Sequence, residues 1–414
     1  MSADADYCPS CFSVPGPDRA GTCATCGWRP GADNEPPFLP LGTLLDGRYR
    51  LGRVLGHGGF GITYLAWDEN LELILAVKEY LPRDCATRGA DGATISVYSN
   101  RSEEFEYGLA RFIDEARALA RFDQHPGVVG VKNFFRGHGT GYIVMDYVPG
   151  ITLKDFLERK GGRIAFELAL RLLLPVMDAL RAVHTAELLH RDVAPDNIRI
   201  TPEGQVKLLD FGAARQAAGE HSRSLSVLLK PGYAPPEQYR TRGNQGPWTD
   251  VYALAATLYR CITGRNPPEA LDRMEEDELV APSRLGVAIP AAAESALMQG
   301  LAVKVRERTQ NVGALQEGLA ISHEPRGNAA APRRNASGTG VERNAPERVP
   351  TRRVETTNKP KAAAPPAPQD LGGGPFASAE PSPFADPDVR NDIVRGIVVT
   401  VVIFVVLGVI VVAL

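Results

Sequence analysis

The sequence has little cysteine and almost no net charge. Six cysteines among 414 residues are too few for a disulfide scaffold. A formal net charge of −3 excludes the overall positive field that duplex-binding proteins usually carry. Residues 1–6 include two aspartates and contain no apolar run, so we expect no secretory signal peptide there. With 44% hydrophobic residues, however, the chain is not wholly disordered, and its length predicts two or three folded units.

The composition divides the chain into four parts. Residues 1–40 hold four of the six cysteines and much proline and glycine, whereas residues 45–320 show the mixed strand-like and helix-like patterns of a folded domain. Residues 322–392 are rich in proline, alanine, glycine and arginine. They contain too few large apolar side chains to offset the entropy of ordering, so we predict a disordered linker. Residues 396–414 carry no charge and are mostly valine and isoleucine.

Residues 396–414 predict a single transmembrane helix. A helix of this length covers about 28 Å at about 1.5 Å per residue, close to the bilayer core of about 30 Å. The alternative, a buried β-strand, would be unusually long. Arg390 and Arg395 precede the segment, and positive charge favours the cytoplasmic side. We therefore expect a single-pass protein of the cell membrane whose folded parts are cytoplasmic.

Four cysteines near the N-terminus form two CxxC pairs, Cys8 with Cys11 and Cys23 with Cys26. Each pair places two thiolates on one side of a tight turn, and together they provide the four sulfur ligands that Zn²⁺ prefers. Gly27 gives the backbone freedom to turn behind the second pair. The pattern resembles the knuckles of zinc ribbons. Because so short a segment cannot fold on apolar burial alone, a structural zinc ion would supply much of its stability.

Two other interpretations of these cysteines are weaker. A pair of disulfides does not suit the cytoplasm, and a redox dithiol normally lies in a βαβ pattern that this region lacks. Tyr7 and Trp28 fit the core of the segment better than a partner surface. Basic and stacking residues are few here, so we expect contact with protein and no nucleic-acid partner.

The segment from Leu55 to Tyr64, LGHGGFGITY, contains a GxGxxG pattern. In dinucleotide-binding folds a helix follows this pattern, but here strand-favouring residues follow. A glycine-rich hairpin of this kind places backbone N–H groups over phosphates because no side chain blocks their approach. The next strand carries Lys78, whose amine can reach the same phosphates.

Four further motifs follow in order: FIDEA at residues 112–116, HRDVAPDN at 190–197, DFG at 210–212 and PPE at 235–237. Together with the glycine-rich hairpin they resemble the protein kinase family, in particular the eukaryotic-like (Hanks-type) serine/threonine kinases of bacteria. The resemblance covers residues 45–320. It implies an α+β, bilobal fold with a β-rich N-lobe and an α-rich C-lobe.

The resemblance also implies roles for individual residues. Asp192 orients the attacking hydroxyl group, Asn197 and Asp210 bind Mg²⁺, and Lys78 holds the α- and β-phosphates while paired with Glu115. Any one of these acidic or amide side chains could alone be a turn former, but all of them together favour the catalytic interpretation. The expected ATP-binding residues are Leu55, Gly56, His57, Gly58, Gly59, Phe60, Gly61, Thr63, Ala76, Lys78, Met145, Tyr147 and Val148.

Other expectations concern the support of this site. Asp250 should brace the catalytic loop, and Arg308 should pair with Glu237. Arg191 precedes the catalytic aspartate and in such kinases binds a phosphate on the activation segment. The candidate phosphorylation sites are Ser222, Ser224 and Ser226, although these serines could simply make a loop polar.

Three positions depart from the family pattern. Thr63 replaces a valine of similar shape, Ala194 stands where serine/threonine kinases have a lysine that contacts the γ-phosphate, and Lys230 occupies roughly the place of a substrate-positioning threonine. The last two leave the acceptor specificity open. Residues 82–106 form an insertion that either controls the position of the helix carrying Glu115 or has no special role.

We therefore expect an ATP- and Mg²⁺-dependent kinase that phosphorylates serine or threonine of cytoplasmic proteins and of itself, with a homodimer serving autophosphorylation. Linker sites for this modification are Thr351, Thr356 and Thr357. One alternative is a pseudokinase, a nucleotide-binding scaffold that acts through protein interactions. Another is a kinase of a small molecule or lipid near the bilayer.

Overall fold

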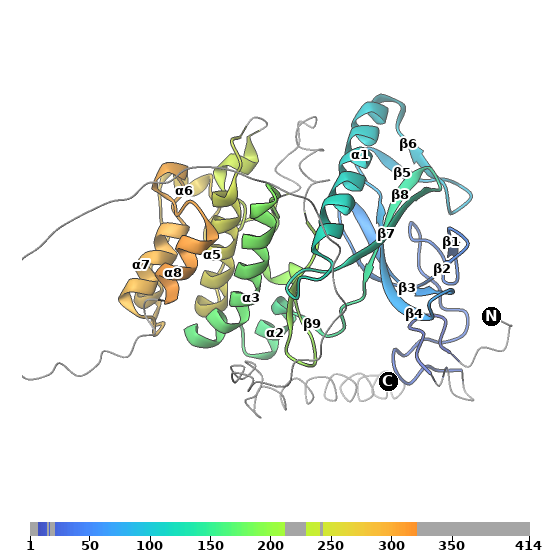
Figure 1. The fold of residues 1–414 in the computed structure, drawn as a ribbon, viewed down its shortest axis with the longest axis horizontal. Coiled ribbons are helices and arrows are strands. Elements are labelled where there is room, and N and C mark those ends of the chain that lie inside the picture. The colour runs from blue at the N-terminus through green and yellow to red at the C-terminus, as the bar shows by residue number, and fades with distance from the viewer. Residues whose placement is uncertain (1–6, 15, 17–20, 212–228, 241–242, 321–414) are drawn as a thin grey trace, which may run out of the picture. The chain divides into compact units, whose positions relative to one another are not determined.

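The computed structural model describes residues 7–14, 16, 21–211, 229–240 and 243–320 (Figure 1). The six-stranded sheet lies in the N-terminal part of the described residues, and most of the helices follow it in the sequence. The expected bilobal α+β fold is confirmed. Among these residues no helix is long and apolar enough to cross a membrane. The predicted linker at 322–392 and the predicted membrane helix at 396–414 lie outside the described residues.

The N-lobe is built on a six-stranded antiparallel sheet with the order β1-β2-β3-β4-β8-β7. Its register places Lys78 of β4 between Thr63 of β3 and Ile143 of β8, and Ala76 opposite Met145. The residues of β3, β4 and β8 that are predicted to contact the nucleotide are therefore neighbours in the sheet. The strands are β1 (Leu44–Leu45), β2 (Tyr49–His57), β3 (Gly61–Asp68), β4 (Leu73–Tyr80), β7 (Val131–Gly137) and β8 (Thr140–Asp146).

Helix α1 (Ser102–Leu119) packs against β7 and β8, as Figure 1 shows. Its buried side chains Phe105, Leu109, Phe112 and Ala116 recur at helical spacing and form its apolar face. Glu115 lies on the same helix and is 8% exposed. The sheet thus positions the helix that carries this glutamate.

The insertion predicted at residues 82–106 contains a hairpin of β5 (Ala86–Arg88) and β6 (Ile95–Val97), and its last residues, from Ser102 on, belong to α1. The guanidinium of Arg88 donates to Glu79 Oε1 over 2.8 Å, and the Tyr142 hydroxyl donates to the same oxygen over 2.9 Å. Glu79 is fully buried, and a buried carboxylate is tolerated only when it is paired and hydrogen-bonded. The insertion therefore supplies the charge partner of the residue that follows Lys78.

The C-lobe packs α3 against α5 and α8, and α7 against α8 (Figure 1). Pro247 is the first residue of α5, where a backbone N–H group would have no acceptor within the helix, so proline costs no hydrogen bond there. Gly264 ends the helix with φ +77°. The α-helices are α2 (Leu153–Arg159), α3 (Phe166–Thr185), α5 (Pro247–Thr263), α6 (Asp272–Glu275), α7 (Ala291–Gly300) and α8 (Val312–Ala320). Short 3₁₀ helices lie at Ser99–Arg101, Ala120–Phe122, Pro195–Asn197, Pro236–Tyr239, Pro282–Leu285 and Val305–Glu307.

A small antiparallel sheet of the C-lobe carries the loops of the site. Its order is β11-β10-β9, from β9 (Ile151–Thr152), β10 (Ile198–Ile200) and β11 (Val206–Leu208). The HRDVAPDN loop runs directly into β10, and Asp210 follows β11 by two residues. Pairing of β10 with β11 therefore brings two motifs of the sequence to one place.

Candidate active site

A cavity of about 450 Å³ is lined by the glycine-rich hairpin, strands β3 and β4, the segment after β8 and the C-lobe loops. All thirteen residues that the sequence predicts as ATP contacts line it, together with Asp192, Asn197 and Asp210. Glu115 is buried on α1 and is not among the lining residues. Its pairing with Lys78 stays a prediction. The remaining lining residues are Phe112, Val129, Asp146, Thr152, Asp196, Arg199, Leu209, Phe211 and Lys230.

The hairpin between β2 and β3 needs glycine for two different reasons. A Cβ at Gly61 would collide with the carbonyl oxygen of Glu79 on the neighbouring strand, so no side chain fits there. Gly58, in contrast, has open space where its side chain would be, so its backbone faces the cavity unobstructed. The Gly58 N–H donates to the Gly61 carbonyl over 2.9 Å and closes the turn. The hairpin is therefore suited to cover phosphate groups.

Lys78 and Asp210 form an ion pair of 2.7 Å between Nζ and Oδ1. Withdrawal from solvent raises the pKa of Asp210, but the charge and hydrogen bond of Lys78 outweigh this effect and hold the pKa below its ordinary value. The carboxylate is therefore ionised at neutral pH, and it lines the cavity. An ionised carboxylate that faces a cavity is a hard oxygen ligand of the kind that Mg²⁺ prefers.

Asp192 is held by its own loop. The Asn197 side-chain amide donates to Asp192 Oδ2 over 2.7 Å and to the Asp192 carbonyl over 2.8 Å. The Asp192 N–H donates to Nδ1 of His190, so the other ring nitrogen of His190 donates to the Leu209 carbonyl over 2.8 Å. Burial lowers the pKa of His190, which keeps this ring neutral. Asp192 is thus oriented toward the cavity, with 7% of its surface exposed.

Asp250 braces this loop, as predicted. It is fully buried and accepts the backbone N–H groups of His190 over 2.8 Å and Arg191 over 2.7 Å, and it contacts His184 Nε2 at 2.7 Å. Arg191 has φ +67°, a left-handed conformation that is unfavourable for residues other than glycine. The two N–H bonds to Asp250 hold the backbone in this conformation, and Asp192 follows it directly.

The predicted pair of Glu237 and Arg308 is also confirmed. Arg308 Nη1 lies 2.6 Å from Glu237 Oε1, and both side chains are buried. The neighbouring Gln238 donates to the Arg191 carbonyl over 2.9 Å, which connects this segment to the catalytic loop. The three serines predicted as phosphorylation sites, Ser222, Ser224 and Ser226, lie outside the described residues.

Two cavity residues make contacts that the sequence did not reveal. Lys230 Nζ lies 3.3 Å from Asp192 Oδ2 and 2.9 Å from Asp196 Oδ2, whereas Ala194 is fully buried and offers no charge. Arg199 stands alone as a charged residue between two isoleucines of β10, and its guanidinium donates to the Gly150 carbonyl over 3.0 Å. A lone charge in an apolar strand was the one signal that could have indicated Arg199.

The four N-terminal cysteines are brought together, and their sulfur atoms all lie within 4.8 Å of one another. The Sγ atoms of Cys8 and Cys26, and those of Cys11 and Cys23, are 3.7 Å apart. A tetrahedral zinc site with bonds of about 2.3 Å separates its sulfur atoms by about 3.8 Å, whereas a disulfide brings them to about 2 Å. All four are free thiols, so the arrangement fits a metal and not a pair of disulfides.

This cysteine cluster packs on the N-lobe. Phe12 lies 6.1 Å from Trp67 between ring centres, and the Arg53 N–H donates to the Ser10 carbonyl over 2.9 Å. Leu55 and Tyr147, which line the large cavity, also pack against the cluster. Tyr7 and Trp28 are partly buried against it, in agreement with their predicted core position. The segment is therefore continuous with the wall of the cavity.

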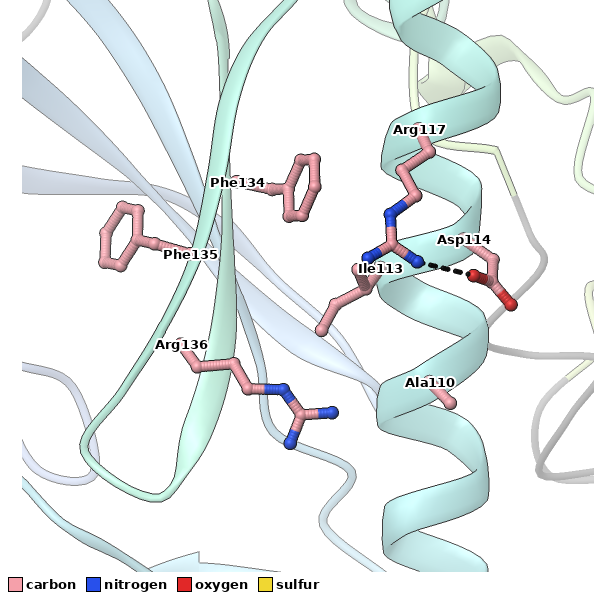
Figure 2. Close-up of a pocket in the computed structure, with 7 residues that line it drawn as sticks. All are labelled: Ala110, Ile113, Asp114, Arg117, Phe134, Phe135 and Arg136. Carbon is pink, nitrogen blue, oxygen red and sulfur yellow. Dashed lines mark hydrogen bonds and ion pairs between the residues drawn. The ribbon is translucent and has the colours of Figure 1, made fainter.

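A second pocket, of about 310 Å³, lies between α1 and β7 (Figure 2). Figure 2 shows Phe134 and Phe135 on opposite sides of the strand and Arg117 beside Asp114, with 3.1 Å between Nη1 and Oδ1. The Arg117 guanidinium also lies over the Phe134 ring, 5.2 Å from its centre. The pocket contains none of the predicted catalytic residues.

The protein kinase domain family matches residues 49–284, more than half of the chain. With the fold and the cavity just described, this match shows that the chain belongs to the protein kinase family. Among its relatives is the serine/threonine-protein kinase PknA of Mycobacterium tuberculosis, 36% identical over 233 residues, which are 55% of this chain and 49% of PknA. That relative is named a serine/threonine-protein kinase.

Two more proteins are similar to this chain. A probable serine/threonine-protein kinase of Clostridium perfringens is 30% identical over 269 residues, which are 63% of this chain and 36% of that protein. The solved structure of PpkA-294 in its apo form has 37% identity and a TM-score of 0.61, and the match covers 68% of this chain and 99% of that one. The chain thus spans half or less of the length of the Clostridium protein and of PknA.

Proposed function

We propose that this protein transfers the γ-phosphoryl group of ATP to serine or threonine of cytoplasmic proteins and of itself. The observation that carries the proposal is the convergence of Lys78, Asp192, Asn197 and Asp210 on one cavity beneath the glycine-rich hairpin. Several relatives are named serine/threonine-protein kinases. A scaffold without catalysis would not need these four side chains in one place, so the pseudokinase alternative is not favoured.

The chain's own residues have separate tasks in this reaction. Lys78 binds the phosphates that lie under the hairpin, and Asp210 and Asn197 would hold Mg²⁺ through their side-chain oxygens. Bound Mg²⁺ would neutralise charge on the phosphate oxygens. Asp192 orients the acceptor hydroxyl group and takes its proton, while Asn197 keeps the Asp192 carboxylate in place through the 2.7 Å hydrogen bond.

Transfer of label from γ-labelled ATP tests this function. We expect the full chain with Mg²⁺ to label itself and a general protein acceptor on serine or threonine, and Asp192→Ala to lower the rate by about 10²- to 10⁴-fold. Mass spectrometry of the labelled chain would locate the phosphates, with Ser222, Ser224, Ser226, Thr351, Thr356 and Thr357 as the expected sites. Asp178→Asn, an exposed change on α3, is the matched control.

Equal labelling by the wild-type protein and Asp192→Ala would contradict the proposal. So would label found only on lipid or a small molecule, which would favour the alternative acceptor classes. Autophosphorylation whose rate per molecule rises with protein concentration would support a reaction between two copies of the chain. A phosphate on the activation segment would pair with Arg191, which contacts the Gln245 side chain at 3.1 Å.

We further propose that residues 396–414 anchor the protein in the cell membrane with the kinase domain in the cytoplasm. The support is the uncharged run itself and the two arginines before it. We expect the full chain to sediment with membranes and to resist extraction by carbonate, and a chain ended at residue 392 to stay in the supernatant. A full chain found in the supernatant would refute the anchor.

We also propose that the four cysteines, Cys8, Cys11, Cys23 and Cys26, hold one structural zinc ion. The support is the 3.7 Å spacing of the sulfur pairs and the burial of three of the four side chains. Thiolate sulfur selects Zn²⁺ over Mg²⁺, whose preferred ligands are oxygens. The cluster and the kinase cavity would thus bind different metals.

A further inference from the structure

We propose that Lys230 contacts the phosphoryl group during transfer and acts as a catalytic residue beside Asp192. The inference rests on the proposed kinase function. The ammonium group of Lys230 lies 3.3 Å from Asp192 Oδ2 and 2.9 Å from Asp196 Oδ2, and the side chain lines the same cavity as Lys78. The two lysines therefore flank different carboxylates: Lys78 contacts Asp210, and Lys230 contacts Asp192.

The position of Lys230 suits stabilisation of the negative charge on the transferring phosphoryl group. A hydroxyl group bound to Asp192 lies within hydrogen-bond distance of that carboxylate, about 3 Å. Lys230 Nζ is 3.3 Å from the same carboxylate and its side chain lines the same cavity, so we place the attacked phosphorus within reach of this amine. An ammonium group has three N–H donors, and two carboxylate contacts leave one for a phosphoryl oxygen. A cation already placed there stabilises the transition state.

The backbone holds Lys230 in this position. The N–H groups of Tyr233 and Ala234 both donate to the Lys230 carbonyl over 3.1 Å, which forms a tight turn. Gly232 has φ +81°, and a Cβ there would lie 2.6 Å from the Pro267 carbonyl oxygen, so the turn packs closely on the C-lobe. The Tyr233 hydroxyl donates to Asn266 Oδ1 over 2.9 Å. The turn thus fixes the backbone that carries the amine.

Position 194 of the loop that contains Asp192 brings no charge to the cavity. Ala194 is fully buried and apolar, and the side chain of Arg191 contacts Gln245. Lys230 is 24% exposed, so its ammonium group is open to the cavity. The charge that a lysine at position 194 would bring is supplied instead from a segment 36 residues further along the chain.

The proposed step keeps Lys230 protonated throughout. The acceptor oxygen forms a bond to the γ-phosphorus as the bond between this phosphorus and the β,γ-bridging oxygen breaks. ADP leaves with that electron pair, and Asp192 takes the hydroxyl proton. Lys230 donates a hydrogen bond to a γ-phosphoryl oxygen and neither gains nor loses a proton.

Steady-state kinetics of Lys230→Met test the inference. We expect kcat to fall about 10²-fold, with nucleotide affinity changed less than about threefold, because the contact is strongest in the transition state. Lys154→Met, an exposed change on α2, is the matched control and should keep wild-type kinetics. The thermal unfolding midpoint and nucleotide affinity of each variant show whether the fold and the cavity are intact.

Chemical rescue separates a direct contact from a structural role. In Lys230→Ala the missing side chain leaves room for a small amine, so methylammonium or ethylammonium should raise kcat several-fold, with no effect on Asp192→Ala. If Lys230→Met keeps at least half of the wild-type kcat, or if a folded Lys230→Ala is inactive and not rescued, the inference is overturned. A wild-type protein without transfer activity would overturn the proposed function itself, and this inference with it.

Discussion

Removing the proposed zinc ion from the four-cysteine cluster should unfold the N-terminal segment and weaken nucleotide binding. Structural zinc contributes about 10–16 kcal/mol to the folding of small domains, and a segment of this size buries little apolar surface of its own. Two side chains, Leu55 and Tyr147, both pack against the cluster and line the nucleotide cavity. Loss of the cluster therefore removes the packing behind one wall of that cavity.

The experiment is the double substitution Cys8→Ser and Cys26→Ser, made in the full chain. We expect elemental analysis to find one zinc per wild-type chain and none in the variant, with a lower thermal unfolding midpoint and a several-fold weaker nucleotide affinity. Cys85→Ala removes a buried thiol outside the cluster and should leave the zinc content unchanged. A wild-type protein that holds no zinc, or a variant with unchanged nucleotide affinity, would contradict this prediction.

Replacing Lys78 by methionine should lower the rate of phosphoryl transfer about 10²- to 10³-fold. Lys78 lies between Thr63 and Ile143 in the sheet and extends into the cavity, where it forms the 2.7 Å ion pair with Asp210. Methionine has a similar length and shape but no charge, so it removes the attraction to the phosphates while it preserves the packing. The control is again Lys154→Met.

The measurements for Lys78→Met are kcat, nucleotide affinity and the thermal unfolding midpoint. We expect the first two to fall, because Lys78 contacts phosphates that are present in the bound substrate as well as in the transition state. The midpoint should change little, since the ion pair with Asp210 is partly exposed. A variant that transfers phosphate at the wild-type rate would show that Lys78 does not bind the nucleotide.

Much of the cavity could be predicted because its residues lie in short continuous motifs. The glycines of the hairpin, the residues of the HRDVAPDN loop and Asp210 each belong to a run whose local geometry the neighbouring residues determine. Asn197 and Asp192, for instance, are five residues apart and meet within a single loop. Motifs this short can be recognised from the spacing of their residues. The type of chemistry could therefore be predicted without knowledge of the fold.

Contacts between distant segments could not be predicted in the same way. Arg88 comes from an insertion of ambiguous role, yet its guanidinium neutralises the buried Glu79 next to Lys78. Lys230 is a departure from the family pattern, and its distance from Asp192 depends on a turn packed against the 266–267 segment. Neither the pair of Arg88 and Glu79 nor the pair of Lys230 and Asp192 follows from a fixed spacing along the chain. The packing of separate elements determines which residues come into contact.

The amino-acid order alone predicted a phosphate-binding hairpin, a catalytic loop, a magnesium-binding aspartate and a sulfur cluster suited to zinc. Those features need only local spacing and the chemistry of the side chains. The tertiary structure alone decided that Lys230 stands beside Asp192 and that the cysteine cluster packs behind Leu55 and Tyr147. Such neighbours result from strand register and the packing of buried side chains, which bring together residues that are far apart in sequence.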